Sequence, residues 1–141
     1  MARMRARWLW WGIGAGVAAW LLWMTLRPNQ AVAADLSPLT RPAAALGFSP
    51  YLLIDLAGNV FVFVPLGATL VLALAGRPAG RRLGLAVLLG AGFSLSIELV
   101  QAALPARVAQ PGDWALNTLG TAIGALTGWL AERAIRREVV S

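Results

Sequence analysis

Four stretches of this chain each run for about twenty residues with almost no charged side chain. They cover residues 8–26, 52–75, 83–104 and 114–131, and the first holds no charge in 19 residues. A helix rises about 1.5 Å per residue, so each stretch would cover about 30 Å, the thickness of the hydrocarbon core of a bilayer. The sequence therefore predicts an all-α fold, an integral membrane bundle of four transmembrane helices forming one domain over residues 1–141.

The first stretch has a competing interpretation as a signal peptide. Arg3, Arg5 and Arg7 precede it, and Ala31-Val32-Ala33 further along resembles a cleavage site. The apolar region of a signal peptide is usually about 7–15 residues long, which is shorter than the 19 residues found here. We therefore favour an uncleaved transmembrane helix.

The composition agrees with lipid as the surrounding solvent. Hydrophobic residues make up 59% of the chain and charged residues 13%, whereas a soluble domain carries about 25% charged residues. The formal charge of +6 comes from arginines between the apolar stretches, which favours anionic lipid over nucleic acid as the partner. The chain has no Cys and no His, the residues that most often serve as nucleophile, general base or metal ligand. We expect no catalytic residue, metal or cofactor.

The arginines are distributed unevenly among the loops. Three lie in two of the connections, Arg27, Arg41 and Arg107. The other nine lie at the two ends of the chain and in the connection between the second and third stretches: Arg3, Arg5, Arg7, Arg77, Arg81, Arg82, Arg133, Arg136 and Arg137. Loops rich in arginine stay in the cytoplasm. This pattern predicts a multi-pass protein of the cytoplasmic (inner) membrane with both termini inside.

A few polar residues interrupt the apolar stretches, at spacings of three or four. Ionisable groups inside a membrane are costly and often functional. These residues lie in the second, third and fourth predicted helices. The predicted topology puts them toward the outer leaflet in each helix, and Arg107 lies in a short outer loop nearby. We predict one polar binding cluster there, formed by Asp55, Asn59, Glu98, Gln101, Arg107, Asp113 and Asn117.

Each member of this cluster also has a structural interpretation. Asp113 follows Pro111-Gly112 and suits an N-cap, where its charge favours the helix dipole. Asp55 suits the same role in its own helix. Glu98 and Arg107 would stabilise each other as an ion pair. The amides would join helices through hydrogen bonds worth about 1 kcal/mol each; they belong to Asn59, Gln101 and Asn117.

Proline and glycine positions predict how the helices pack. Pro65 lies in the middle of its stretch, where it should kink the helix unless neighbours satisfy the freed carbonyl. Small residues four apart allow two helix backbones to approach closely. The last stretch has three glycines at this spacing, Gly120, Gly124 and Gly128, and the second has Gly67. This ridge would pack within the bundle or join two copies in a homo-oligomer.

The polar and small residues fall into blocks that resemble the VanZ-like family of membrane proteins. The blocks are Asp55-x-x-x-Asn59-x-x-x-Phe63-x-Pro65-Leu66-Gly67, Ser94-x-x-x-Glu98-x-x-Gln101, Arg107, and Asp113-x-x-x-Asn117-Thr118-x-Gly120-x-x-x-Gly124. The resemblance covers about residues 52–129. Family members often carry a further polar or acidic residue just before the last Asp, whereas this chain has Ala109-Gln110-Pro111-Gly112 there.

The resemblance implies a protein of the bacterial cell envelope with no established catalytic mechanism. The founding member is associated with lowered susceptibility to the glycopeptide antibiotic teicoplanin. We therefore expect a non-catalytic protein whose polar cluster binds a lipid or glycan headgroup or a glycopeptide-type drug. Its expected partners are membrane lipid and a lipid-linked envelope precursor or glycopeptide. One alternative is a membrane-embedded enzyme for a lipid-linked substrate, using an acid or a metal held by Asp55, Glu98 and Asp113. Another is a structural accessory subunit.

Overall fold

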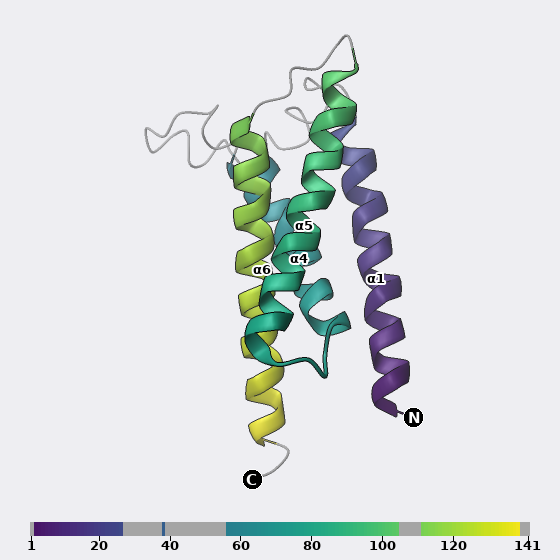
Figure 1. Ribbon diagram of the computed structural model, residues 1–141, viewed down its shortest axis with the longest axis vertical. Helices are drawn as coiled ribbons and strands as arrows, with labels where there is room; N and C mark the ends of the chain where they lie inside the picture. Colours follow the sequence, from purple (N-terminus) through teal and green to yellow (C-terminus); the bar gives the residue numbers. More distant parts are fainter. Residues whose placement is uncertain (1, 27–37, 39–55, 105–110, 139–141) are drawn as a thin grey trace.

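The computed structural model describes residues 2–26, 38, 56–104 and 111–138 of the chain. These residues form helices and no strand: α1 (Ala2–Thr25), a short π-helical turn η1 (Leu56–Phe61), α4 (Val62–Ala73), α5 (Ala79–Ala102) and α6 (Pro111–Glu138). The four longer helices lie alongside one another in a bundle, with both chain termini at the same end (Figure 1). The all-α prediction is confirmed for the described part of the chain.

Each predicted stretch overlaps a helix, although the ends differ. The first and last stretches lie within or close to the longer helices α1 and α6, and 83–104 falls largely on α5. The stretch 52–75 corresponds to η1 followed by α4, and its first residues lie outside the described ones. Helix α6 continues to Glu138, well past the predicted end at 131. Apolar patterning could not detect this extension because the added turns are charged.

Among the described helices, α5 is the one that is both long enough and apolar enough to cross a membrane. The stretch Gly58–Ala73 is also apolar but is shorter. Helix α1 is rich in tryptophan, and the second half of α6 is charged. Length and composition of the described helices alone therefore do not establish four spans.

Helices α4 and α6 approach so closely that glycine is required at the contact. A Cβ atom added to Gly67 would lie 2.0 Å from the carbonyl oxygen of Thr121, and one added to Gly124 would lie 1.9 Å from that of Val64. Gly120 meets η1 in the same way. The glycine ridge of α6 therefore faces α4 and η1 of its own chain. A homo-oligomer stays a prediction, and it would need another surface.

Pro65 lies inside α4, and the helix continues past it to Ala73. Proline has no N–H, and its ring collides with the carbonyl four residues earlier, here that of Phe61. The π-helical turn η1 ends at Phe61. A π-helical turn is wider than an α-helical one, so we interpret η1 as the local adjustment that admits the proline. The Pro65 ring itself is exposed.

The hydrophobic core lies between the helices, and the outer surface is apolar as well. The buried core includes Leu21, Phe63, Val71, Ile97 and Ala125. The outward face of α6 is equally apolar, with large side chains that remain 41–50% exposed. They recur at helical spacing, at Leu119, Ile123, Leu126 and Leu130. The described bundle thus has apolar side chains on both sides of its helices.

Candidate functional site

Helix α6 joins the polar residues of its two neighbours at the end opposite the termini. Near its start, Asp113 accepts a hydrogen bond from Asn59 of η1, with 3.1 Å between Nδ2 and Oδ1. One turn further on, Asn117 donates from its Nδ2 to the Ser94 hydroxyl of α5 over 2.9 Å. Two of the predicted amides and one predicted carboxylate therefore come together. We call Asn59, Ser94, Glu98, Asp113 and Asn117 the outer polar cluster, after the side of the membrane that the sequence predicts for this end of the bundle.

The register of α5 against α6 gives Glu98 its place in this cluster. The two helices are antiparallel, and Ser94 lies opposite Asn117. One turn away, a Cβ on Gly90 would meet the Thr121 side chain at 2.3 Å. One turn in the other direction, the same register sets Glu98 level with Asp113. Glu98 is buried, with 8% of its surface exposed, so the cluster carries two carboxyl groups at one depth.

Asn117 holds the most unusual atom of the cluster. The residue is 2% exposed, and within the described part of the chain its buried Oδ1 accepts no hydrogen bond. Leaving a buried acceptor unsatisfied costs about 1–3 kcal/mol. The neighbouring Thr121 hydroxyl does not satisfy it, because that group donates to the backbone carbonyl of Asn117 over 3.0 Å. The side-chain oxygen of Asn117 is thus a buried acceptor to which no described residue donates.

Gln101 does not share these contacts. Its Nε2 donates to the carbonyl oxygen of Thr25 over 2.7 Å and so ties the end of α5 to the end of α1. A helix ends with carbonyl groups that have no partner in the helix, and this bond satisfies one of them. We interpret Gln101 as a structural link between the two helices.

The remaining predicted members, Asp55 and Arg107, lie outside the described residues. The full cluster of seven and the ion pair between Glu98 and Arg107 therefore stay predictions. Within the described ranges, no three carboxylates come together in a way that could hold a metal ion. The metal-dependent alternative would need Asp55, so it also stays a prediction.

A second set of polar side chains, which the sequence did not predict, lies at the other end of the bundle. Glu132 of α6 accepts a charge-assisted hydrogen bond from Nη2 of Arg82 on α5, while Arg136 bonds its second oxygen at 2.6 Å. Arg82 is buried and also donates from Nε to the Val71 carbonyl of α4. We call Arg82, Glu132 and Arg136 the inner charge cluster. It joins the ends of three helices.

The charges of this cluster act on Glu132. Burial raises its pKa, but the hydrogen bonds and positive charges of Arg136 and Arg82 outweigh that effect, so the pKa lies below its ordinary value of 4.5. The sequence did contain a signal, because Glu132 is an acid inside an arginine-rich segment. Its partner is 50 residues away, which no local pattern could identify.

The fold and these two clusters define a class of protein: an all-helical bundle with an apolar exterior, polar residues between the helices at one end and arginines at the other. The family model described as VanZ/LLP1 matches residues 9–132. The chain therefore belongs to the VanZ/LLP1 family, which confirms the resemblance and extends it into α1. No curated protein and no solved structure matches the chain.

Proposed function

We propose that this protein crosses the bacterial cytoplasmic membrane four times, with both termini inside, and that its outer polar cluster binds the polar headgroup of a lipid-linked envelope component. The protein acts by binding, without catalysis. The proposal has three parts, which are the membrane placement, the orientation and the binding site. Each is supported by a different set of described residues.

The exposed apolar surface supports the membrane placement. In the most apolar window of α5, 28% of the residues are buried, whereas the core helix of a soluble protein would be mostly buried. Leu88 and Leu99 on its outer face are 67% and 65% exposed. The outward face of α6 carries an apolar stripe of the same kind. Contiguous apolar patches of this extent suit contact with lipid.

The distribution of arginines supports the orientation. The start of α1, the connection from α4 to α5 and the last turns of α6 all lie at one end of the bundle (Figure 1). The arginines described there are Arg5, Arg7, Arg77, Arg81, Arg82, Arg133, Arg136 and Arg137. A membrane protein keeps such an end in the cytoplasm. The outer polar cluster would then lie near the opposite leaflet.

The observation that carries the binding proposal is the buried Oδ1 of Asn117, which accepts no hydrogen bond from a described residue. Around it, the cluster offers amide donors, a hydroxyl and carboxylate acceptors. Sugar hydroxyls both donate and accept, so a glycan headgroup fits this mixture of groups. A glycopeptide drug presents sugar hydroxyls too, which extends the proposal to a role in teicoplanin susceptibility.

The membrane placement and the orientation can be tested with single cysteines, because the chain contains none. Gly80→Cys puts a thiol in the arginine-rich connection, and Ala109→Cys puts one in the segment of sequence that precedes α6. A membrane-impermeant maleimide should label Ala109→Cys in intact cells and Gly80→Cys after permeabilisation. Labelling of both variants, or of Gly80→Cys alone, in intact cells would refute the topology.

The binding site can be tested on the full chain in detergent. The probes are a polyprenyl-linked disaccharide, polyprenyl phosphate without sugar, and teicoplanin. We expect a probe that carries sugar to bind, and Asn117→Leu to weaken binding about tenfold, which corresponds to about 1.4 kcal/mol. Thr127→Val is the control, since that exposed hydroxyl bonds its own helix. Equal affinity in Asn117→Leu and wild type, or binding of the phosphate probe alone, would contradict the proposal.

A further inference from the structure

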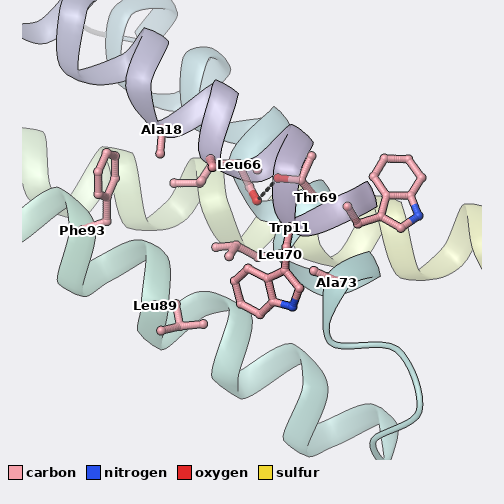
Figure 2. A pocket seen from close by; sticks show the side chains of 11 residues that line it. Trp11, Ala18, Leu66, Thr69, Leu70, Ala73, Leu89 and Phe93 are labelled. Atoms are coloured by element: carbon pink, nitrogen blue, oxygen red, sulfur yellow. Dashed lines mark hydrogen bonds between the residues drawn. The ribbon is translucent and has the colours of Figure 1, made fainter. Parts of the chain in front are cut away.

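A groove lies between α1, α4 and α5, and none of the residues that line it belongs to either polar cluster. Its volume is about 240 Å³. Helix α4 forms its floor, with Leu66, Thr69, Leu70 and Ala73. Two further residues, Leu89 and Phe93, line it from α5, and small residues of α1 line the remaining wall together with Trp10 and Trp11 (Figure 2).

The groove exists because α1 packs against α4 and makes little contact with α5. The wall from α1 contains Gly14, Ala15 and Ala18, whose small side chains leave space open. In Figure 2 the Trp11 indole extends from α1 toward Leu89 on the opposite wall. The small residues of α1, beside its two tryptophans and opposite Leu89 and Phe93 of α5, thus create an apolar slot.

The lining of the slot is almost wholly apolar. Its polar groups are the Thr69 hydroxyl, which bonds within α4 to the carbonyls of Leu66 at 2.9 Å and Pro65 at 3.0 Å, and the indole N–H groups of Trp10 and Trp11. A hydrocarbon chain can therefore occupy the slot without leaving the Thr69 hydroxyl unsatisfied. The volume is below the 300–1,000 Å³ or so of pockets for drug-sized ligands. This volume suits part of one acyl chain better than a whole lipid headgroup.

The inner end of the slot is positively charged. Arg7 on α1 donates from its Nε to the carbonyl oxygen of Ala73, a lining residue, over 3.4 Å. Its side chain is exposed, and Arg77 and Arg81 are exposed at the same end of the bundle. Guanidinium groups bind phosphate through paired N–H donors, and basic sites between helices on the cytoplasmic side bind anionic lipid headgroups.

We propose that this slot holds one acyl chain of an anionic phospholipid from the cytoplasmic leaflet, with its phosphate bound by Arg7. The lipid would fill the gap between α1 and α5 and so complete the bundle. This inference depends on the proposed membrane placement and orientation. It does not depend on headgroup binding at the outer polar cluster, which lies at the other end.

Native mass spectrometry of the purified full chain tests the proposal, with phosphatidylglycerol and phosphatidylcholine of identical acyl chains as probes. Wild type should retain one phosphatidylglycerol about fivefold more strongly than phosphatidylcholine. Arg7→Gln should remove that preference, whereas Arg5→Gln, an equal loss of charge on the same helix, should preserve it. Asn117→Leu should also preserve it, so a failure of the outer site is distinguishable from a failure of this one.

The proposed binding of the acyl chain is tested by Ala18→Phe, which fills the slot. Its control is Ala19→Phe, one position further along α1 and outside the lining. Ala18→Phe should reduce retention of both lipids at least fivefold, and Ala19→Phe should not. If Ala18→Phe does not fold, Ala15→Phe at the mouth of the slot replaces it. Equal retention of the two lipids by wild type, or equal effects within either pair of variants, overturns the proposal. If Ala18→Phe abolishes a dimer of the chain and leaves lipid retention unchanged, the proposal is wrong and the slot is a contact between two copies.

Discussion

At the inner end of the bundle, Arg82, Glu132 and Arg136 satisfy one another, whereas at the outer end Asn117 keeps a buried oxygen that no described residue bonds. Both regions place polar side chains between the same two helices, α5 and α6. The inner cluster uses full charges and ties three helix ends together. The outer polar cluster uses amides, one hydroxyl and carboxyl groups, and Oδ1 of Asn117 accepts no hydrogen bond from a described residue.

This difference leads us to expect that the inner charge cluster stabilises the fold more than the outer polar cluster does. Removing one member of a buried ion pair leaves an uncompensated charge, which is strongly destabilising. Hydrogen bonds between neutral side chains of membrane helices average about 0.6 kcal/mol. The hydrogen bond between Asn117 and Ser94 should therefore contribute less to stability than the ion pair between Arg82 and Glu132.

The largest effect should come from the contact between α4 and α6. Gly124→Ala would place a Cβ 1.9 Å from the Val64 carbonyl oxygen, so the helices must separate, and we expect a loss of about 3 kcal/mol or more in unfolding free energy. Gly92→Ala is the control, because nothing lies within 4 Å of a Cβ at that glycine. Equal stability of the two variants in detergent would contradict the described packing.

The next largest effect should come from the inner charge cluster. Glu132→Gln leaves the buried Arg82 without its carboxylate, and we expect a loss of about 2 kcal/mol, less than for a fully buried pair. Glu138→Gln, at the exposed end of α6, should change stability by less than about 0.5 kcal/mol. Adding Arg82→Met to Glu132→Gln should recover part of the loss. If Glu132→Gln matches wild type in chemical denaturation, the inner cluster does not stabilise the fold.

A smaller effect should appear as a dependence on pH. Because the pKa of Glu132 is lowered in the folded protein, its contribution is fully present above the ordinary value of 4.5 and is lost as pH falls through the lower folded value. The thermal unfolding temperature of wild type should therefore fall more steeply below pH 4.5 than that of Glu132→Gln. Parallel curves would show that the two arginines do not hold this carboxylate.

The sequence predicted the helices well because their cause is local. Long apolar stretches and arginine-rich connections are visible without any tertiary information, and the glycine spacing of α6 predicted a close contact. The sequence could not choose the partner of that contact, which is Gly67 and its neighbours on α4. Nor could it predict the π-helical turn before Pro65, because a proline in a helix can be accommodated by a kink as well as by a wider turn.

The outer polar cluster was partly predictable for the same reason. Helical spacing put Asn59, Asp113 and Asn117 on polar faces of their helices, and in the structure Asn59 bonds Asp113 while Asn117 bonds Ser94. The sequence could not predict that Asn117 bonds Ser94 or that Gln101 bonds the end of α1, because both contacts depend on the register between helices. The inner charge cluster was not predicted because Arg82 and Glu132 are 50 residues apart in the chain.

The most direct test of this account measures stability and ligand response together in Asn117→Leu and Glu132→Gln. We expect Asn117→Leu to stay within about 1 kcal/mol of wild type but to lose the thermal stabilisation that a polyprenyl-linked disaccharide gives wild type. Glu132→Gln should be less stable yet keep that response. If Asn117→Leu unfolds readily, or responds to the disaccharide as wild type does, the outer polar cluster is structural and the proposed binding site is wrong.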